Sequence, residues 1–297
     1  MLRPPPLRPG DRIAVVAPSS PYDRDRFERG LERLSGRYEV SLPPSLFERK
    51  RYLAGSDEVR AAQLADAFGD DQIRAIFTAR GGSGAARLLP LIDLGQMPLK
   101  PLVGLSDITV LHAALQTARR VSIHGPAITQ LMEQPDWVLA RLFSLLEGQV
   151  ADPLSGTPLV PGVAEGPLLG GNLTVFATLL GTRWMPDVSA AVLLLEEVSE
   201  PPYRIDRVWT HLRNAGVIGR VAGIALGTFL DCEPPETKYG PHTAREVLAD
   251  LAAAAGVPCV ADLPVGHGQV NAPLALGARV RLDGSAGTLT SLEAATA

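Results

Sequence analysis

The sequence predicts an α/β protein with a parallel sheet in its N-terminal part and a second, smaller mixed α/β domain after it. Between residues 12 and 148, short apolar segments alternate with helical patterns of ten or more residues. Such alternation is typical of βαβ units, in which helices cover both faces of a parallel sheet. A stretch dense in proline and glycine follows. We therefore expect an N-terminal domain at 1–150, a linker at 151–170 and a C-terminal domain at 171–297.

Each element of the first domain is predicted from a local pattern. Short runs of apolar and β-branched residues predict strands at residues 12–18, 38–43, 74–79, 101–105 and 121–125. Longer runs with apolar residues at helical spacing predict helices that begin near Tyr22, Ser56, Gly84, Ser106 and Trp137. Ligands of such sheets bind beyond the carboxyl ends of the strands, and Ser106 directly follows one of those ends.

The same patterns predict the second domain. Helices are expected from Asn172, from about Tyr203 to Ala215, and from about His242 to Ala255. Strands are expected at residues 190–198, 221–230 and 258–264. The last two segments, residues 274–283 and 287–293, are typical of a hairpin that turns about Asp283 and Gly284.

Composition and charge exclude several classes of function. The chain has 297 residues, 28 Lys and Arg, 32 Asp and Glu, a net charge of −4 and 5% aromatic residues. A nucleic-acid-binding protein usually has a basic surface and stacking aromatic residues, so we expect no nucleic-acid partner. No apolar run reaches the ~18 residues of a membrane span, and the start does not have the pattern of a signal peptide. We therefore expect no membrane partner and a cytoplasmic location.

The cysteines and histidines do not have the spacing of a metal site. Cys232 and Cys259 are the only cysteines, and they form neither a disulfide framework nor a ligand motif. The sequence contains no HExxH. We expect neither a metal nor another cofactor.

The sequence GLSD, residues 104–107, marks the passage from a strand to a helix. In one interpretation Ser106 caps this helix and Asp107 suits the positive end of its dipole. In the other, Ser106 is a nucleophile at the end of a strand. The helix that follows has one apolar face, on which His112 is expected to be a core residue.

The sequence TARGGSGAAR, residues 78–87, is a glycine-rich turn between a strand and a helix. It approaches the dinucleotide fingerprint G-x-G-x-x-G/A, but Arg87 stands at the last position and the next strand ends without an acidic residue. Bare backbone N–H groups in such a turn can instead face a developing negative charge, as an oxyanion hole requires. A plain tight turn also fits the pattern.

Two further segments contain residues that suit acid–base chemistry. The strand at 190–198 ends in Glu196 and Glu197, and alternation along a strand sends only one of them into a given cleft. A solvated strand end is the plain alternative. His267 lies between two glycines in a loop, where its ring nitrogens can accept a proton from one group while donating to another. His124 ends a strand and is a candidate to border the same cleft.

These features together supply the parts of a serine hydrolase. Ser106, His267 and Glu196 provide a hydroxyl, a base and an orienting carboxylate, and the turn at Gly81 and Gly82 provides backbone donors. The chain order Ser, Glu, His is that of the α/β-hydrolases. However, GLSD lacks the second glycine of their G-x-S-x-G elbow, so this is not the motif of that family.

A series of motifs points to one family. APSSP at Ala17 to Pro21 is followed by ARGGSGAARLL, GLSDIT, HGP, LLGGNL, LEEVSEPPYRIDR and VGHGQVNAPLALG. In this order and approximate spacing, over nearly the whole chain, they resemble the LD-carboxypeptidases. These are serine peptidases that include the muramoyl-tetrapeptide carboxypeptidase and the microcin C immunity peptidases.

The resemblance implies a fold and a set of roles. The expected fold is a flavodoxin-like or Rossmann-like domain followed by a smaller α/β domain, with the site between them. Ser106 is implied as nucleophile, His267 as general base and Glu196 as the orienting carboxylate. The implied oxyanion hole consists of the backbone N–H groups of Gly82 and Asp107.

The resemblance also has implications for three more residues. Asn172 is implied near the substrate, with a helix N-cap as the plain alternative. Ser83 stands where the family usually has Tyr or a larger residue, which bears on the shape of the pocket. Trp184 is the candidate to stack on a nucleobase if the chain is of the immunity type.

The function implied is release of D-alanine from cytoplasmic murein tetrapeptides during peptidoglycan recycling. The resemblance also implies a homodimer, which no residue pattern in this chain indicates. An immunity-type peptidase that cleaves aminoacyl-nucleotide antibiotics is the alternative within the same chemistry. A non-catalytic two-domain binding protein is the alternative of another class, and the intact Ser, Glu and His disfavour it.

Overall fold

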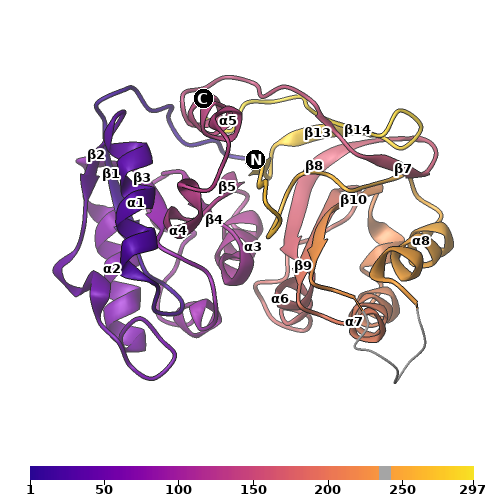
Figure 1. The fold of residues 1–297 in the computed structure, drawn as a ribbon, viewed down its shortest axis with the longest axis horizontal. Coiled ribbons are helices and arrows are strands. Elements are labelled where there is room, and N and C mark those ends of the chain that lie inside the picture. Colours follow the sequence, from indigo (N-terminus) through magenta and orange to yellow (C-terminus); the bar gives the residue numbers. More distant parts are fainter. Residues whose placement is uncertain (234–241) are drawn as a thin grey trace.

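The computed structural model describes residues 1–233 and 242–297, and it contains two sheets side by side (Figure 1). The first has the strand order β12-β5-β4-β3-β1-β2. Its strands are β1 (Arg12–Val16), β2 (Glu39–Ser41), β3 (Ile73–Thr78), β4 (Leu102–Gly104), β5 (Ser122–His124) and β12 (Leu274–Leu276). The parallel order β2-β1-β3-β4-β5 is that of flavodoxin-like folds, so the predicted fold class is confirmed.

Helices cover both faces of this sheet because its strands are apolar on both sides. Alternate residues of β1 point to opposite faces, so Ile13 and Val15 join one apolar cluster while Ala14 and Val16 join another. The first cluster includes side chains of α1 (Arg24–Ser35), α4 (Ile128–Leu131) and α5 (Asp136–Leu146). The second includes those of α2 (Asp57–Gly69) and α3 (Thr109–Thr117). Short 3₁₀ turns are η1 (Pro44–Phe47), η2 (Ala85–Leu88) and η3 (Ser106–Ile108); the helix expected near Gly84 is only η2.

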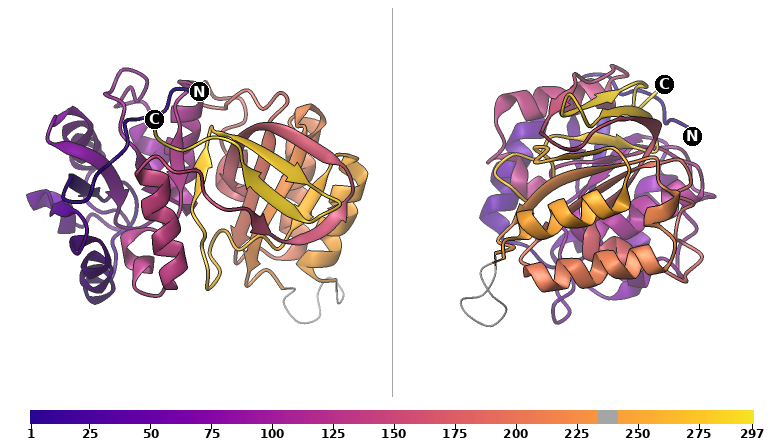
Figure 2. Two further views of the ribbon diagram at one scale, coloured as in Figure 1. Left: turned by 90° about the horizontal axis from the view of Figure 1, so that it is seen from above. Right: turned by 90° about the vertical axis from the view of Figure 1, so that its right-hand side faces the viewer.

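The second sheet has the strand order β6-β14-β13-β8-β9-β10-β11-β7. Its strands are β6 (Leu154–Ser155), β7 (Thr157–Val160), β8 (Val163–Asn172), β9 (Val192–Val198), β10 (Gly223–Leu230), β11 (Cys259–Ala261), β13 (Arg279–Asp283) and β14 (Thr288–Ser291). The associated helices are α6 (Leu173–Ala177), α7 (Pro202–Asn214) and α8 (Ala244–Ala255), with the 3₁₀ turn η4 (Ile218–Arg220). Figure 2 shows α7 and α8 side by side along one face of this sheet. The predicted hairpin of residues 274–293 is present as β13 and β14.

The predicted linker at 151–170 is wrong, because those residues form β6, β7 and most of β8. β6 and β7 lie at the two edges of the second sheet, where the missing N–H of Pro158 is tolerated. In β8 the glycines permit close approach between chains. A Cβ at Gly166 or Gly170 would overlap the backbone carbonyl oxygen of Ala190 or Leu194. The glycines that suggest a loop therefore meet a packing requirement within the sheet.

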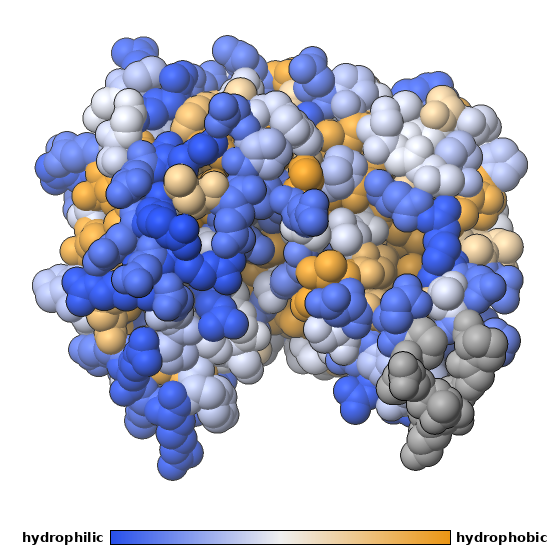
Figure 3. All heavy atoms as spheres, viewed as in Figure 1, coloured by the Kyte–Doolittle hydropathy of each residue, from blue (hydrophilic) through white to orange (hydrophobic). Residues whose placement is uncertain are grey.

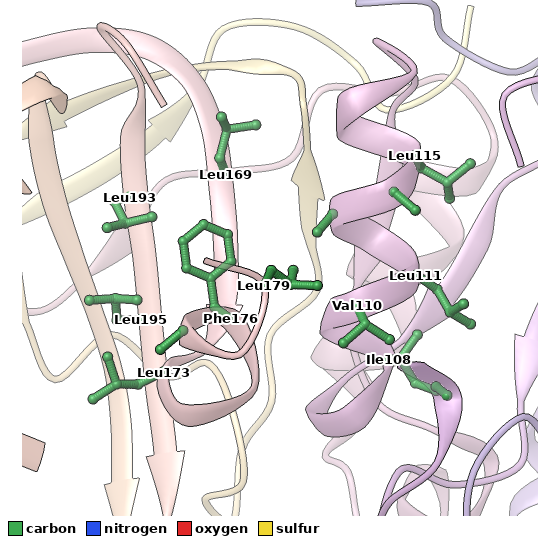
Figure 4. Packing of buried hydrophobic residues seen from close by; sticks show 14 of the residues in the cluster. Ile108, Val110, Leu111, Leu115, Leu169, Leu173, Phe176, Leu179, Leu193 and Leu195 are labelled. Carbon is green, nitrogen blue, oxygen red and sulfur yellow. The ribbon is translucent and has the colours of Figure 1, made fainter. Parts of the chain in front are cut away.

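Two features join the predicted domains 1–150 and 171–297 more closely than the sequence indicates. β12 comes from the second half of the chain but pairs antiparallel with β5 of the first sheet. Helix α3, predicted with one buried face, is buried from Thr109 to Gln116 because the second sheet packs on its other side. Figure 4 shows α3 beside α6, β8 and β9, with the apolar side chains of one cluster drawn on both sides.

Within residues 1–233 and 242–297, no helix has the length and apolar character required to cross a membrane.

Gly170 tests the packing explanation for the glycine-rich strand. Its φ is +110°, and an added Cβ would meet the rigid carbonyl of Leu194, so Gly170→Ala is expected to lower the free energy of unfolding by about 2 kcal/mol or more. Gly219→Ala is the matched control, because nothing lies within 4 Å of its added Cβ and its backbone is not left-handed. Urea denaturation of both variants measures the difference; equal stability would contradict the explanation.

Candidate active site

Ser106 lies at the tight turn between β4 and α3. Its φ is +64°, a left-handed conformation that is uncommon outside glycine. Leu105, with extended backbone, occupies the cap position of η3, and no side chain caps η3 or α3. The interpretation in which the Ser106 side chain caps the helix is therefore wrong, since a cap residue needs the extended backbone that Leu105 has. The strained turn instead matches the geometry of a nucleophile elbow.

The glycine-rich loop after β3 lies directly against Ser106. A Cβ added to Gly81 would lie 2.7 Å from the Ser106 Cβ and 3.1 Å from its Oγ, so the Ser106 side chain requires a glycine there. Gly82 follows with a φ of +113°. In the part of the chain that the structure describes, the N–H groups of Gly82 and Asp107 donate to no protein acceptor. Both implied oxyanion donors are thus unengaged beside the hydroxyl.

The Asp107 carboxylate connects the loops that follow β1, β3 and β4 by hydrogen bonds. It is buried, and its Oδ2 accepts hydrogen bonds from the Ser19 hydroxyl at 2.7 Å and from the Ala85 N–H at 2.8 Å. These partners follow β1 and β3, while Asp107 itself follows β4. β1 and β3 flank the point where the strand order reverses, where ligands bind in such sheets.

The buried guanidinium of Arg60 reinforces this junction. It donates to the backbone oxygens of Pro18, after β1, and Gly84, after β3. The sequence alone indicates neither the Asp107 contacts nor those of Arg60, since an acid at a helix start and an arginine within a helix are usually solvated.

Alternation along β9 separates the two glutamates as predicted. Leu193 and Leu195 belong to the cluster around α3, and Glu197 continues their face. Val192 and Leu194 belong to the opposite cluster, and Glu196 continues that face. Both carboxylates are buried, so the plain alternative of a solvated strand end is wrong; the neighbouring elements pack over both faces of the strand end.

His267 pairs with Glu196. Its Nδ1 lies 2.6 Å from Glu196 Oε2, and the Glu196 side chain is fully buried. A Cβ added to Gly266 would lie 2.6 Å from the same Oε2, so the pair requires a glycine at that position. The loop is held by the Asn271 Oδ1, which accepts from the Gly266 N–H at 2.9 Å, and the Asn271 N–H donates to Gln134 Oε1 at 2.8 Å. Sequence reasoning missed the contact between Asn271 and Gln134 because the two residues are 137 positions apart in the chain.

Environment sets the pKa of His267 above the ordinary value. Burial is the largest single influence and lowers the pKa, but the hydrogen bond with Glu196 and the negative charges of Glu196 and Glu197 together outweigh it. Nδ1 donates to the carboxylate when the ring is neutral, which leaves Nε2 as the proton acceptor.

Ser106 and His267 line one cavity of about 500 Å³, which we call the active-site cavity. Gly81 and Gly82, which follow β3, and Val198, on β9, line it as well. Residues next to both sheets therefore contribute to its wall. Figure 3 shows the surface hollowed between the two lobes along the lower edge. The structure therefore brings together Ser106, His267, Glu196, Gly82 and Asp107.

Asn172 does not join them. Its Oδ1 accepts from the Val175 N–H at 3.0 Å, its Nδ2 donates to Glu197 Oε1 at 2.7 Å, and it does not line the active-site cavity. The structure shows the plain alternative, in which Asn172 is the N-cap of α6. Glu197 Oε2 also accepts the Thr174 N–H at 2.9 Å, so these two residues build the helix start together.

The remaining candidates also have definite places. His112 is buried between Ser122 and the Gly104 carbonyl, and burial lowers its pKa to about 4. His124 is fully buried, does not line the active-site cavity, and has a pKa lowered to about 3 chiefly by burial. Trp184 lines a separate cavity of about 450 Å³ together with Arg183.

Ser83, the departure from the family pattern, is exposed, and its N–H donates to the Ser20 hydroxyl at 3.1 Å. Its side chain does not line the active-site cavity.

Comparison with known proteins places this arrangement in context. A model of the LD-carboxypeptidase N-terminal domain matches residues 13–125, and a model of the LD-carboxypeptidase C-terminal domain matches residues 165–282. The chain is 44% identical over 297 residues to a putative carboxypeptidase of Synechocystis, with coverage of 98% of this chain and 97% of the relative. It is 34% identical over 292 residues to the murein tetrapeptide carboxypeptidase of Pseudomonas aeruginosa, with coverage of 92% and 94%.

Among solved structures, the wild-type apo form of the microcin C7 self-immunity protein MccF matches with a TM-score of 0.88 at 22% identity. The match covers 100% of both chains, and it shows a shared fold.

Titration of His267 tests the physical origin of its pKa. We expect imidazole NMR to report a pKa above about 6.5 in the wild type and a clear decrease in Glu196→Gln, which removes the paired charge. Glu197→Gln is the matched control and is expected to lower the pKa less, because Glu197 acts on His267 through its charge without a hydrogen bond. A His267 pKa that does not respond to Glu196→Gln would contradict the assignment.

Proposed function

From the premise that this chain belongs to the LD-carboxypeptidase family, we propose that it is a serine peptidase that cleaves the L,D bond of murein tetrapeptides and releases D-alanine. The observation that carries the proposal is the active-site cavity itself. A strained Ser106 faces it beside two unengaged N–H groups, and it also contains His267 bound to a buried glutamate. Together these are the parts of nucleophilic catalysis on a carbonyl.

In the proposed mechanism each residue acts on a named atom. The Ser106 Oγ attacks the carbonyl carbon, and His267 Nε2 takes the hydroxyl proton. Glu196 Oε2, at 2.6 Å from Nδ1, keeps the ring in the required tautomer and stabilises its cationic form. The N–H groups of Gly82 and Asp107 stabilise the oxyanion. His267 then protonates the departing amine, and water releases the acyl group by the same sequence.

The substrate class is proposed from the family and from the chemistry that the chain lacks. The Pseudomonas relative is a murein tetrapeptide carboxypeptidase, and this chain aligns with it over nearly the full length of both. The sequence has no S-x-x-K, S-D-N or K-T-G, the motifs of the enzymes that cleave D,D bonds. We place the reaction in the cytoplasm, where recycled muropeptides are the substrate.

Replacement of each triad residue tests the mechanism. Ser106→Ala, His267→Ala and Glu196→Ala are each expected to lower kcat by about a thousandfold or more, and double variants to lose little more, because the three act as a unit. In the wild type, kcat/KM is expected to fall as the pH drops below the raised pKa of His267, since protonation removes the base. Release of D-alanine measured by mass provides the rates; full activity of Ser106→Ala would exclude the mechanism.

Glu197→Ala is the matched comparison for Glu196→Ala. Its removal leaves the buried donors of Asn172 and Thr174 unpaired, so we expect a loss of about 1–3 kcal/mol in the free energy of unfolding and a much smaller loss of kcat. Equal loss of kcat in the two variants would mean that the orienting acid is wrongly assigned.

The choice of bond provides a separate test. We expect release of D-alanine from the tetrapeptide, roughly hundredfold slower hydrolysis of the pentapeptide, and no covalent trapping by penicillin, because inversion at the attacked residue misplaces the carbonyl. Incubation with a defined muropeptide mixture and mass analysis of the products measures all three. An intact tetrapeptide together with cleavage of an aminoacyl sulfamoyl adenylate would replace the proposed function with the immunity-type activity.

A further inference from the structure

Two arginines, Arg26 and Arg80, line the active-site cavity, and their charges are balanced differently. Arg26 Nη2 lies 2.8 and 2.7 Å from the two carboxylate oxygens of Glu133, so its charge is paired. Arg80 donates from Nη1 to the backbone oxygen of Pro21 at 3.0 Å. Nowhere in residues 1–233 or 242–297 does a carboxylate form an ion pair with Arg80. Its guanidinium is exposed in the cavity with its charge unpaired.

One carboxylate, Asp23, also lines the cavity, but it is already engaged. Its Oδ1 accepts the Arg26 N–H at 2.8 Å as the N-cap of α1, and the positive end of that helix stabilises its charge. The remaining N–H donors of Arg80 are therefore available to a ligand. A guanidinium with free neighbouring donors suits a carboxylate, which it can bind through two parallel hydrogen bonds.

Arg80 lines the same cavity as Ser106, where the terminal carboxylate of a substrate must lie. Arg80 directly precedes Gly81, whose backbone lies against Ser106. When a peptide is cleaved before its last residue, the terminal carboxylate is only a few covalent bonds from the attacked carbon, within about 4 Å along the chain. A cation that binds this carboxylate must share the cavity with the nucleophile, and Arg80 does.

We propose that Arg80 binds the terminal carboxylate of the substrate and so restricts the reaction to the last residue of a peptide. The inference rests on the proposed function and adds the group that makes the enzyme a carboxypeptidase. An amide or a longer chain at the same position has no charge for Arg80 to bind, so it loses the interaction while the Ser106 chemistry is unchanged.

The proposal is tested by changing Arg80 and the terminal carboxylate of the substrate, first separately and then together. The substrates are the tetrapeptide with a free D-alanine carboxylate and the same peptide ending in D-alanine amide. For the wild type we expect kcat/KM to be roughly tenfold to hundredfold higher for the acid. In Arg80→Met this preference should disappear because hydrolysis of the acid slows, while hydrolysis of the amide stays close to the wild-type rate. Arg80→Lys should retain part of the preference, since it keeps the charge without the paired donors.

Arg26→Met is the matched control. It removes a cation from the same cavity whose charge Glu133 already pairs, so the preference for the acid should remain. A third peptide, with L-lysine at the position before D-alanine, tests whether Arg80 instead contacts that residue. Because Arg80 is exposed, the variants should keep the wild-type melting temperature.

The outcomes separate the two proposals. Equal slowing of acid and amide in Arg80→Met, a retained preference, or a change confined to the lysine peptide would overturn the role of Arg80 and leave the proposed function standing. Failure of the wild type to release D-alanine from the acid, or D-alanine amide from the amide, would reject the proposed function, and the inference with it.

Discussion

The burial of helix α3 between the two sheets is the constraint on which the site depends. Ser106 lies in the turn between β4 of the first sheet and α3, whereas Glu196 lies on β9 of the second sheet and His267 on the segment after β11. A hydrogen bond links the end of β8 in the second sheet to the start of α3, because Thr109 Oγ1 accepts the Asn172 N–H at 3.0 Å. A displacement of about 1 Å between reacting groups can cost about a hundredfold in rate. The apolar packing of α3 therefore serves the proposed chemistry, because it fixes the position of Ser106 relative to the sheet that carries Glu196.

Much of the fold and of the candidate site could be predicted, because the relevant signals are local. Strand and helix patterns depend on neighbouring residues, and residues at strand ends such as Ser106 meet at one edge of a parallel sheet. Residues 151–170 misled the prediction because their glycines serve contacts with a distant strand, which no local pattern reveals. The Asp107 carboxylate and the Gln134 amide were missed for the same reason. Their partners are far away in sequence, at Ser19 and Asn271.

Three histidines near the site show how environment divides one residue type into separate roles. His112 and His124 are buried without a carboxylate partner, and their pKa values fall to about 4 and about 3. Both are therefore neutral at physiological pH and serve the core. His267 is also largely buried, but pairing with Glu196 reverses the direction of the shift. In the proposed mechanism, the position of one carboxylate decides which imidazole accepts a proton. The sequence alone predicts His112 within a helix, His124 at a strand end and His267 in a loop.

Because β12 pairs with β5, the first sheet is completed only late in the synthesis of the chain. Until residues 274–276 leave the ribosome, β5 presents an unpaired edge, the kind of surface at which incomplete chains associate with one another. His267 lies on the segment between β11 and β12, so the proposed base is synthesised just before the strand that covers this edge. A nascent chain therefore contains Ser106 and the glycine-rich loop long before it contains His267. In the proposed mechanism hydrolysis requires both residues, so the chain becomes competent only after His267 has been added.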